Sequence, residues 1–406
     1  MSLNAEIKGL FSAYIADFMM AFAENIAIFT AYIAEINMAV YIYQRKNWPD
    51  FQWDREKLAS LLAEVRHRQG RLLGRMEGMG FNLQAEANLR TITLDVLTSS
   101  EIEGEKLNPD QVRSSVARRL GMDIAGLIPA DQHVEGVVEM MLDATQNYKK
   151  ALSDERLFDW HAAMFPTGRS GMHRIVAGRY RDNLRTDPMQ VVSGPIGREK
   201  VHFEAPDASL LKKEMKDFLD WFNKEEHTDP VLKAAIAHLW FVTIHPFDDG
   251  NGRITRAITD MQLSRADKSS QRFYSMSAQI RVERNGYYNI LEETQKDSLD
   301  ITAWLEWFLA CLDRAISNTD ETLAIVLNKA RFWDKHISTP LNDRQKLMLN
   351  KLLDGFNGKL TSSKWATITK SSQDTAGRDI NDLVQKDILV KEPGGGRSTS
   401  YILKDK

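Results

Sequence analysis

Residues 245–256 read HPFDDGNGRITR, and this stretch decides the fold and the chemistry expected of the chain. It follows an apolar run, residues 231–244, that predicts a buried helix, and it leads into a second helix expected to reach about Arg265. Between the two helices stand a histidine, a carboxylate, a Gly-Asn-Gly turn and two arginines. These are the groups that a binding site for nucleotide phosphates requires.

The first half of this stretch suits proton transfer and anion binding. His245 stands at the end of the buried helix, and an imidazole can accept a proton from a substrate hydroxyl near neutral pH. Gly250, Asn251 and Gly252 lie where the next helix begins, and free backbone N–H groups at a helix start form an anion site. Glycine also lets a phosphate approach the backbone closely.

The second half supplies charge. Arg253 and Arg256 are three residues apart, so their guanidinium groups share a helical face and can point at one polyphosphate. A carboxylate beside a phosphate site would be repelled unless it holds a cation, so Asp249 is predicted to bind Mg²⁺. Taken singly, each feature has an ordinary structural interpretation: a structural histidine, a turn, a solvated helix face. Their combination favours a nucleotide site.

With these residues in place, the stretch resembles the Fic family motif HxFx[DE]GNGRxxR at every fixed position, and the similarity covers roughly residues 41–403. The resemblance implies transfer of AMP from ATP to a Ser, Thr or Tyr hydroxyl of a target protein or of the chain itself. It implies that His245 deprotonates that hydroxyl and that Asp249 holds Mg²⁺ between the α- and β-phosphates. Phe247 would face the core and fix the loop.

The resemblance assigns the nucleotide contacts as well. Asn251 and the backbone of the two flanking glycines would cradle the α-phosphate, and Arg253 and Arg256 would bind the β- and γ-phosphates. Tyr287 and Tyr288 lie where the family often contacts adenine, although core packing is an alternative for both. Doc-type kinases of the family transfer phosphate and break the GNG-Arg pattern, which this chain keeps, so AMP transfer is the expected reaction.

A second motif lies upstream. Residues 99–104 read SSEIEG and resemble the Fic inhibitory motif [ST]xxxE[GN], with Ser99, Glu103 and Gly104 in the fixed places. The resemblance implies that Glu103 pairs with Arg256, the arginine expected to bind the γ-phosphate. ATP would then bind with its α-phosphate misaligned for in-line attack. An exposed helix end closed by a glycine is the alternative. The same glutamate could orient water, so a hydrolase that removes AMP is an alternative activity.

Residues 189–206, MQVVSGPIGREKVHFEAP, predict a β-hairpin, because two β-rich runs flank a Ser-Gly-Pro-Ile-Gly turn. The hairpin stands at the position of the Fic flap, which in that family pairs with a segment of the target protein as an added strand. An exposed strand edge recognises mainly backbone groups. An ordinary surface hairpin is the alternative.

The expected fold class is mainly α: a Fic-type helical bundle with a small β-hairpin flap and a C-terminal winged helix-turn-helix. Aspartates at 54, 229 and 300 are placed to cap helices. The expected division is an apolar helical leader (1–38), an N-terminal helical region with the inhibitory motif (39–125), a Fic catalytic domain (126–335) and a winged-helix domain (336–406).

The winged helix is predicted from three short helices, at 344–353, 362–369 and 373–385, followed by a glycine-tipped hairpin. Arg378 could read a base edge, and Lys391 and Arg397 could touch phosphate. Three aspartates on the last helix, Asp374, Asp379 and Asp382, oppose DNA binding. Binding of protein and self-association are alternatives, as is a DNA-binding regulator whose Fic core senses nucleotide.

The composition limits the possible partners and the cellular setting of the protein. The net charge of -3 argues against a mainly electrostatic nucleic-acid binder. Cys311 is the only cysteine, which indicates a reducing, cytoplasmic setting. The first 38 residues are apolar, but acidic residues at 17, 24 and 35 interrupt them, so no transmembrane segment is expected. The leader is expected to pack against the body or against a second copy in a homodimer. Attachment to a membrane surface and an unusual leader, with Met38 as a later start, are alternatives.

Overall fold

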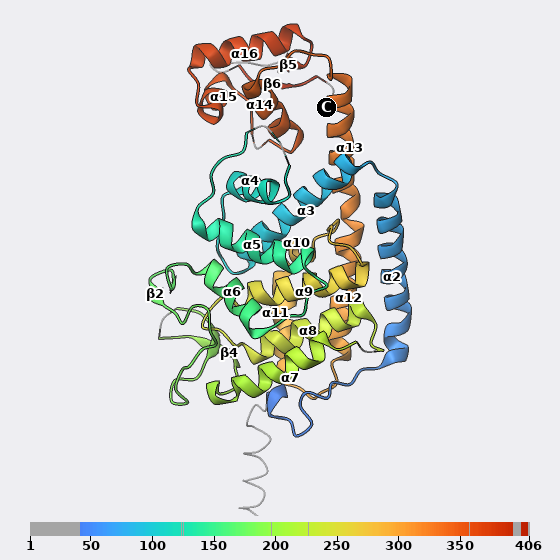
Figure 1. The fold of residues 1–406 in the computed structure, drawn as a ribbon, viewed down its shortest axis with the longest axis vertical. Coiled ribbons are helices and arrows are strands. Elements are labelled where there is room, and N and C mark those ends of the chain that lie inside the picture. The colour runs from blue at the N-terminus through green and yellow to red at the C-terminus, as the bar shows by residue number, and fades with distance from the viewer. Residues whose placement is uncertain are drawn as a thin grey trace, which may run out of the picture.

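The computed structural model describes residues 41–404 except 123, 125, 196, 226, 357 and 393–398. A body of helices carries a smaller C-terminal module at one end, and α13 (Thr319–Lys335) runs from the body to that module (Figure 1). The predicted leader, residues 1–38, and Arg397 lie outside the described residues. Within the described part of the chain, no helix is long and apolar enough to cross a membrane.

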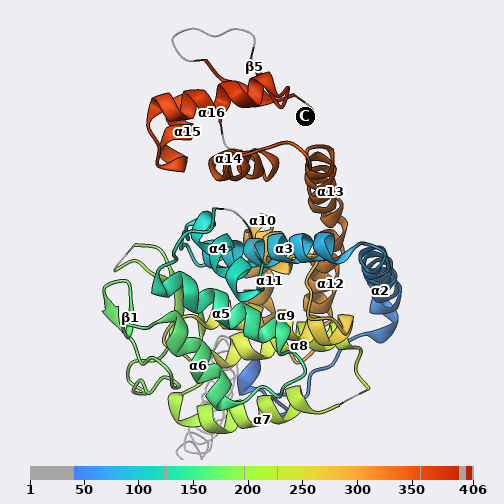
Figure 2. The same cartoon turned by 45° about the horizontal axis from the view of Figure 1, so that its top comes forward.

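Two helices form the centre of the body. α8 (Pro230–Ile244) packs along α9 (Asn251–Asp267). The helices that surround the pair (Figure 2) are α3 (Phe81–Ile102), α5 (Gln132–Gln146), α6 (Asp154–Met164), α7 (Leu211–Asn223) and α12 (Thr302–Ser317). The Asp229 carboxylate caps α8 by accepting from the N–H of Val231 at 2.8 Å, and a proline occupies the first turn, where it breaks no hydrogen bond. Nearly every side chain of α8 is buried, so the predicted central helix is confirmed.

The N-terminal region is helical. Asp54 caps α2 as predicted, accepting from the N–H of Lys57 at 3.0 Å. Asn108 caps a further helix, α4, which was not predicted from the sequence. The elements here are η1 (Ile42–Gln44), α2 (Arg55–Glu77), α3 (Phe81–Ile102) and α4 (Pro109–Arg119).

The remaining body combines helices with two short hairpins. One hairpin pairs β1 (Arg169–Ser170) with β2 (His173–Arg174). The other, predicted from the sequence, pairs β3 (Gln190–Ser193) with β4 (Lys200–Glu204). α5 ends at Gln146, and α6 starts at Asp154 because the Ser153 hydroxyl caps it by accepting from the N–H of Arg156. The elements are α5 (Gln132–Gln146), α6 (Asp154–Met164), β1 (Arg169–Ser170), β2 (His173–Arg174), β3 (Gln190–Ser193), β4 (Lys200–Glu204), η2 (Ala208–Leu210), α7 (Leu211–Asn223), α10 (Met276–Val282), α11 (Arg284–Gln295) and α12 (Thr302–Ser317).

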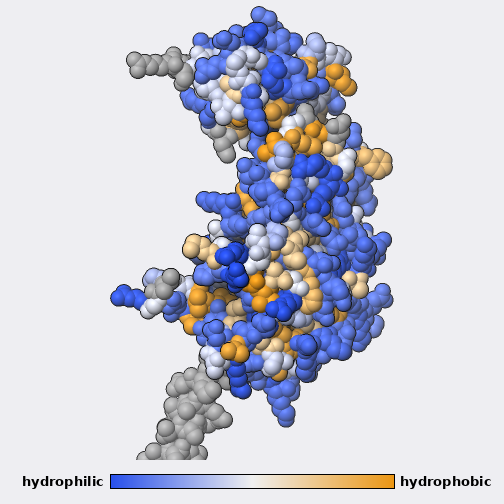
Figure 3. All heavy atoms as spheres, turned by 60° about the vertical axis from the view of Figure 1, so that its left-hand side comes forward, coloured by the Kyte–Doolittle hydropathy of each residue, from blue (hydrophilic) through white to orange (hydrophobic). Residues whose placement is uncertain are grey.

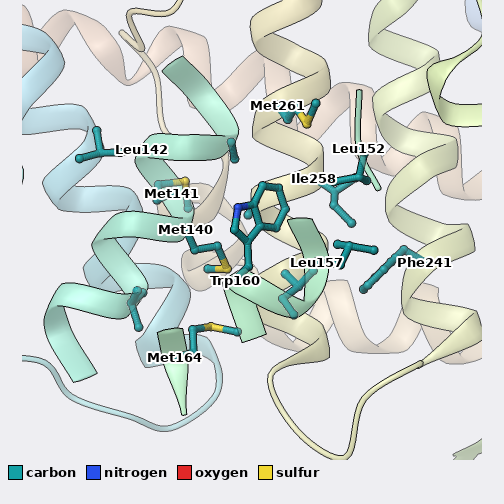
Figure 4. Close-up of a cluster of buried hydrophobic side chains, with 14 of the residues drawn as sticks. Met140, Met141, Leu142, Leu152, Leu157, Trp160, Met164, Phe241, Ile258 and Met261 are labelled. Carbon is teal, nitrogen blue, oxygen red and sulfur yellow. The ribbon is translucent and has the colours of Figure 1, made fainter. Parts of the chain in front are cut away.

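Two apolar clusters hold the body together. Figure 4 shows part of the first, where Trp160 lies among methionine, leucine and isoleucine side chains from several helices. The indole N–H of Trp160 donates to Asp143 at 2.8 Å, so burial leaves no polar group of this ring unpaired. Both clusters combine side chains from either side of the expected boundary at residue 125, and the division into domains stays a prediction.

The C-terminal module has an apolar cluster of its own and the element order predicted from the sequence. Figure 3 shows it standing out from the body with a largely hydrophilic face. The Asp379 carboxylate is nearly buried and accepts from Arg344 at 2.7 Å, while Asp382 pairs with Lys386 at 2.6 Å. The elements are α14 (Asp343–Leu353), α15 (Ser362–Thr369), α16 (Gln373–Gln385), β5 (Leu389–Lys391) and β6 (Tyr401–Leu403), with β5 and β6 antiparallel.

Candidate active site

His245 marks the point where α8 ends. Its backbone is left-handed, with φ of 51°, so the chain leaves the helix axis at this residue. Nδ1 lies 3.3 Å from the carbonyl oxygen of Val242, which favours the proton on Nδ1 and leaves Nε2 as the acceptor. Burial lowers the pKa of His245 to about 4, against the opposing effect of that carbonyl. The imidazole is therefore neutral at pH 7, as a general base must be.

Arg181 fixes the loop that follows His245. Its side chain donates to the carbonyl oxygens of His245, at 2.8 Å, and Pro206, at 2.5 Å, and its backbone N–H donates to Pro246 at 2.9 Å. The guanidinium is 2% exposed, and burial lowers its pKa to about 10. Arg181 therefore ties the loop of the histidine to the end of the flap segment. The sequence reading missed it, because an arginine in a polar loop carries no local signal of burial.

The side chain of Asn251 has a different role from the one expected. Its amide donates to the carbonyl oxygen of Phe247 at 2.7 Å, and its oxygen accepts from the N–H of Phe247 at 2.9 Å. The Phe247 ring is buried, as predicted, and stacks on His161 with ring centroids 4.3 Å apart. Asn251 is 2% exposed, so its side chain shapes the loop and only its backbone N–H remains for a phosphate.

The start of α9 has the geometry expected of an anion site. Gly250 precedes the helix with φ of 79°, and no side chain caps the first-turn N–H groups, so residues 251–253 present free donors. A Cβ on Gly250 would approach the ring of Phe165 to 2.9 Å. A Cβ on Gly252 would lie 2.0 Å from Oε1 of Glu103. The carboxylate of Glu103 therefore lies directly against this anion site.

Glu103 also contacts the second arginine of the motif. Arg256 donates to Oε1 of Glu103 at 2.7 Å and to the hydroxyl and carbonyl oxygens of Ser99, each at 2.8 Å. Burial opposes the charge of Arg256, but Glu103 outweighs it and the pKa of the guanidinium is raised. α3 ends at this point because Gly104 is left-handed, with φ of 84°. Ser99 and Glu103 of the predicted inhibitory motif thus contact Arg256, and Gly104 ends the helix that carries them.

The first arginine is paired with a different carboxylate. Nη1 of Arg253 lies 2.7 Å from Oε2 of Glu105, and the other oxygen of Glu105 lies 2.5 Å from Nε2 of His133. Arg253 is 4% exposed, and its guanidinium lies over the ring of Phe165 at 5.1 Å. The His133 contact lowers the pKa of Glu105, and in turn the pKa of His133 is raised. Arg253 and Arg256, the two residues predicted to bind phosphates, are therefore each paired with a different glutamate.

Asp249 has a donor set that fits Mg²⁺. Its Oδ1 accepts from the N–H of Gly250 at 2.5 Å and its Oδ2 accepts from the hydroxyl of Ser170. Each carboxylate oxygen keeps a further lone pair, which is enough for a cation that is usually held by one or two carboxylates and the phosphates themselves. His161 fixes the backbone, with Nε2 3.1 Å from the carbonyl oxygen of Asp249. The sequence reading missed both Ser170 and His161.

A cavity of about 420 Å³ opens beside His245, but Asp249, Arg253 and Arg256 do not line it. His245, Gly252 and Glu103 line one part of it, and the flap and α11 line the rest. Tyr287 and Tyr288 both line it, but the Tyr287 ring is 2% exposed and its hydroxyl is bonded to His238 at 2.8 Å, so this residue belongs largely to the core. Two larger hollows, of about 850 and 670 Å³, lie elsewhere in the described chain and contain no residue of either motif.

Comparison with protein families agrees with this geometry. Residues 151–263 match the family described as Fic/DOC, a span that contains the whole segment from His245 to Arg256. The chain carries a Fic domain. Residues 41–122, which include Ser99 and Glu103, match a second family described as a domain of unknown function, DUF4172.

Curated relatives of the Fic domain are named as adenylyltransferases. The chain is 34% identical over 97 residues to protein adenylyltransferase fic-1 of Caenorhabditis elegans, which covers 23% of this chain and 18% of the relative. It is 27% identical over 220 residues to protein adenylyltransferase Fic of Drosophila mojavensis, covering 53% of this chain and 38% of the relative. The chain thus spans well under half the length of these relatives.

Solved structures of Fic proteins are also similar. A Fic family protein of Desulfovibrio desulfuricans has a TM-score of 0.45 and 22% identity, covering 86% of this chain and 96% of that one. A Fic domain containing signaling protein of Bacteroides thetaiotaomicron has a TM-score of 0.48 and 18% identity, covering 64% and 97%.

Proposed function

We propose that this Fic-domain protein is a protein adenylyltransferase that moves AMP from ATP to a protein hydroxyl and that Glu103 holds it inactive. The observation that carries the proposal is the position of Glu103. Its carboxylate lies between an uncapped helix start and a buried arginine, 2.7 Å from Arg256, beside a neutral histidine. A carboxylate in an anion site, paired with a cation, stands where a phosphate would stand.

The proposed reaction is an in-line displacement at the α-phosphorus of ATP. Nε2 of His245 takes the proton of the target hydroxyl, the hydroxyl oxygen bonds to the α-phosphorus, and the bond to the β-phosphate oxygen breaks to release pyrophosphate. The first-turn N–H groups of α9 stabilise charge on the α-phosphate, and Arg253 and Arg256 hold the remaining phosphates. Asp249 would hold Mg²⁺, which neutralises phosphate charge when bound.

The proposed inhibition follows from competition for one arginine. While Glu103 occupies Arg256, the γ-phosphate loses its clamp and the α-phosphate is not held in line with the hydroxyl. Misplacement by about 1 Å can cost on the order of a hundredfold in rate. Release of Glu103 would restore both the clamp and the space against Gly252.

The flap is the proposed docking site for the target. β3 and β4 pair only with each other among the described strands, so each presents an open outer edge. A target segment could add to such an edge as a further strand and bring its hydroxyl to the cavity that His245 lines. Backbone pairing would leave the choice of target to the few side chains that face the cavity.

Labelled ATP tests the reaction. With the label in the α-phosphate, Glu103→Gly protein incubated with a cell lysate should modify protein, whereas Glu103→Gly/His245→Ala protein should not. With the label in the γ-phosphate, no protein should be labelled, which separates AMP transfer from phosphate transfer. Label from the γ-position, or equal labelling by both variants, would overturn the proposal.

Removal of AMP is the second candidate, because the Glu103 carboxylate lies against the anion site where it could hold a water. Target modified by Glu103→Gly protein and then incubated with unaltered protein should release AMP if the chain acts in this direction. Glu103→Gln protein should then fail to release it. Retention of the label with unaltered protein would exclude this direction for that target.

A further inference from the structure

Three side chains on the flap and α11 form a chain of hydrogen bonds that the proposed mechanism does not use. The hydroxyl of Ser193 lies 2.6 Å from Nε2 of His202, and Nδ1 of His202 lies 2.5 Å from Oε2 of Glu292. A hydroxyl, an imidazole and a carboxylate in this order are the parts of an activated nucleophile. We refer to them as the Ser193–His202–Glu292 relay.

A β-bulge places His202 in the relay. Val191 pairs with Phe203 and Val192 pairs with Val201, so His202 is the extra residue on β4. A bulge turns a side chain away from the regular alternation of a strand and is frequent beside active sites. Here it lets His202 reach Ser193 on β3 and α11 at once.

The carboxylate of the relay is fixed in its charged form. Glu292 is bonded to Lys296 at 2.7 Å through its other oxygen. Burial raises the pKa of Glu292, but the contacts with Lys296 and His202 outweigh burial and lower it. An ionised Glu292 accepts from Nδ1–H of His202, which leaves Nε2 free to accept the proton of Ser193.

The relay opens into the proposed reaction site. Ser193, His202 and Glu292 line the same cavity of about 420 Å³ that His245, Gly252 and Glu103 line. Under the proposed function this cavity takes up ATP. Two described hydroxyls on the cavity wall have an imidazole within hydrogen-bond distance, Ser193 and Tyr287. Tyr287 is buried in the core, whereas Ser193 is exposed.

We propose that Ser193 is an internal acceptor of the adenylyl group, with His202 as its general base. The proposal rests on the proposed adenylyl transfer. The Ser193 oxygen bonds to the α-phosphorus of ATP, and its proton passes to Nε2 of His202. The bond between the α-phosphorus and the β-phosphate oxygen breaks, and pyrophosphate carries away that electron pair. No oxidant, reductant or third reactant is required.

Peptide mapping tests this assignment on the full chain. Trypsin should release residues 186–198, in which Thr186 and Ser193 are the only hydroxyl side chains. Glu103→Gly protein incubated with ATP and Mg²⁺ should carry an adenylyl group on this peptide, with fragmentation placing it on Ser193. Adding Ser193→Ala should remove it, and adding Ser193→Thr should keep it. Ser209→Ala, an exposed serine outside the cavity, is the matched control and should change nothing.

The variant His202→Gln tests whether His202 acts as the general base for Ser193 or only stabilises the flap. A general base contributes about a hundredfold or more to rate, so this change should slow labelling of Ser193 by at least about tenfold and leave labels at other positions at their former rate. Equal slowing at every labelled position would show that His202 only holds the flap, which overturns its assignment as base.

The remaining outcomes are distinct. Adenylyl groups on other peptides or on lysate proteins, with residues 186–198 unmodified, would overturn the assignment of Ser193 and leave the proposed function standing. A complete absence of adenylyl groups from every protein would overturn both.

Discussion

The position of Glu103 predicts how tightly the protein binds ATP. Oε1 of Glu103 and Nη2 of Arg256 are 2.7 Å apart, and the arginine is 2% exposed. A hydrogen bond between charged groups contributes about 1.5–3 kcal/mol. A γ-phosphate that must displace this contact loses a comparable free energy. At about 1.4 kcal/mol per tenfold, Glu103→Gly should strengthen ATP binding by about ten- to a hundredfold.

Glu105 should have a smaller effect on the same measurement. It contacts Arg253 at the same distance, 2.7 Å, but its side chain is 37% exposed and shared with His133. An ion pair of this exposure contributes at most about 1 kcal/mol, so Glu105→Gln should strengthen ATP binding by no more than about fivefold. The expected order of affinity is therefore Glu103→Gly, then Glu105→Gln, then the parent protein.

Titration calorimetry with ATP and Mg²⁺ measures these affinities. All variants should carry His245→Ala, so that ATP is not consumed during the titration. Glu101→Gln is the matched control, because it removes a charge from the end of the same helix, where Glu101 pairs with Arg281 at 3.2 Å. Equal affinity of Glu103→Gly, Glu101→Gln and the parent would refute competition for Arg256.

Three further predictions concern His245, Asp249 and Arg272. Because burial holds the pKa of His245 near 4, its neutral form is present at all higher pH; transfer by Glu103→Gly protein should rise through about pH 4 and stay level above about pH 6, and a midpoint near 6.5 would contradict this. Asp249→Asn should lower the transfer rate by at least about tenfold and raise the Mg²⁺ concentration for half-maximal rate, and an unchanged Mg²⁺ curve would exclude Asp249 as the ligand. Arg272→Met should lower the free energy of unfolding by about 3–5 kcal/mol in urea titrations, because the buried carboxylates of Asp260 and Asp267, each 3.0 Å from Arg272, lose their partner. Arg281→Met, at an exposed pair, should cost at most about 1 kcal/mol, and a similar loss for both variants would contradict the role of burial.

Features set by neighbouring residues were predictable from the sequence. The caps at Asp54 and Asp229 depend on a side chain and an N–H two or three residues away, so their signal is local. The flap was predicted because its strands and turn are contiguous. The loop from His245 to Gly252 was predicted for the same reason.

Features set by distant residues were not predictable. Arg181 contacts a carbonyl 64 positions away, Glu105 contacts Arg253 across 148 positions, and His202 contacts Glu292 across 90. No local pattern connects such pairs. Asn251 shows a different limit: the sequence places it correctly, but its side chain turns back to the loop backbone, which only the fold determines.

The close approach of Glu103 to Gly252 limits how inhibition could be lost by mutation. A side chain at position 252 would displace the carboxylate, since its Cβ would lie 2.0 Å from Oε1, but it would also obstruct the backbone that the α-phosphate needs. Substitution of Arg256 would release Glu103, but it would also remove a side chain proposed to bind the ATP phosphates. Under the proposed function, a genetic selection for constitutive activity should therefore recover changes in α3 and its end, at Ser99 to Gly104, and almost none in α9.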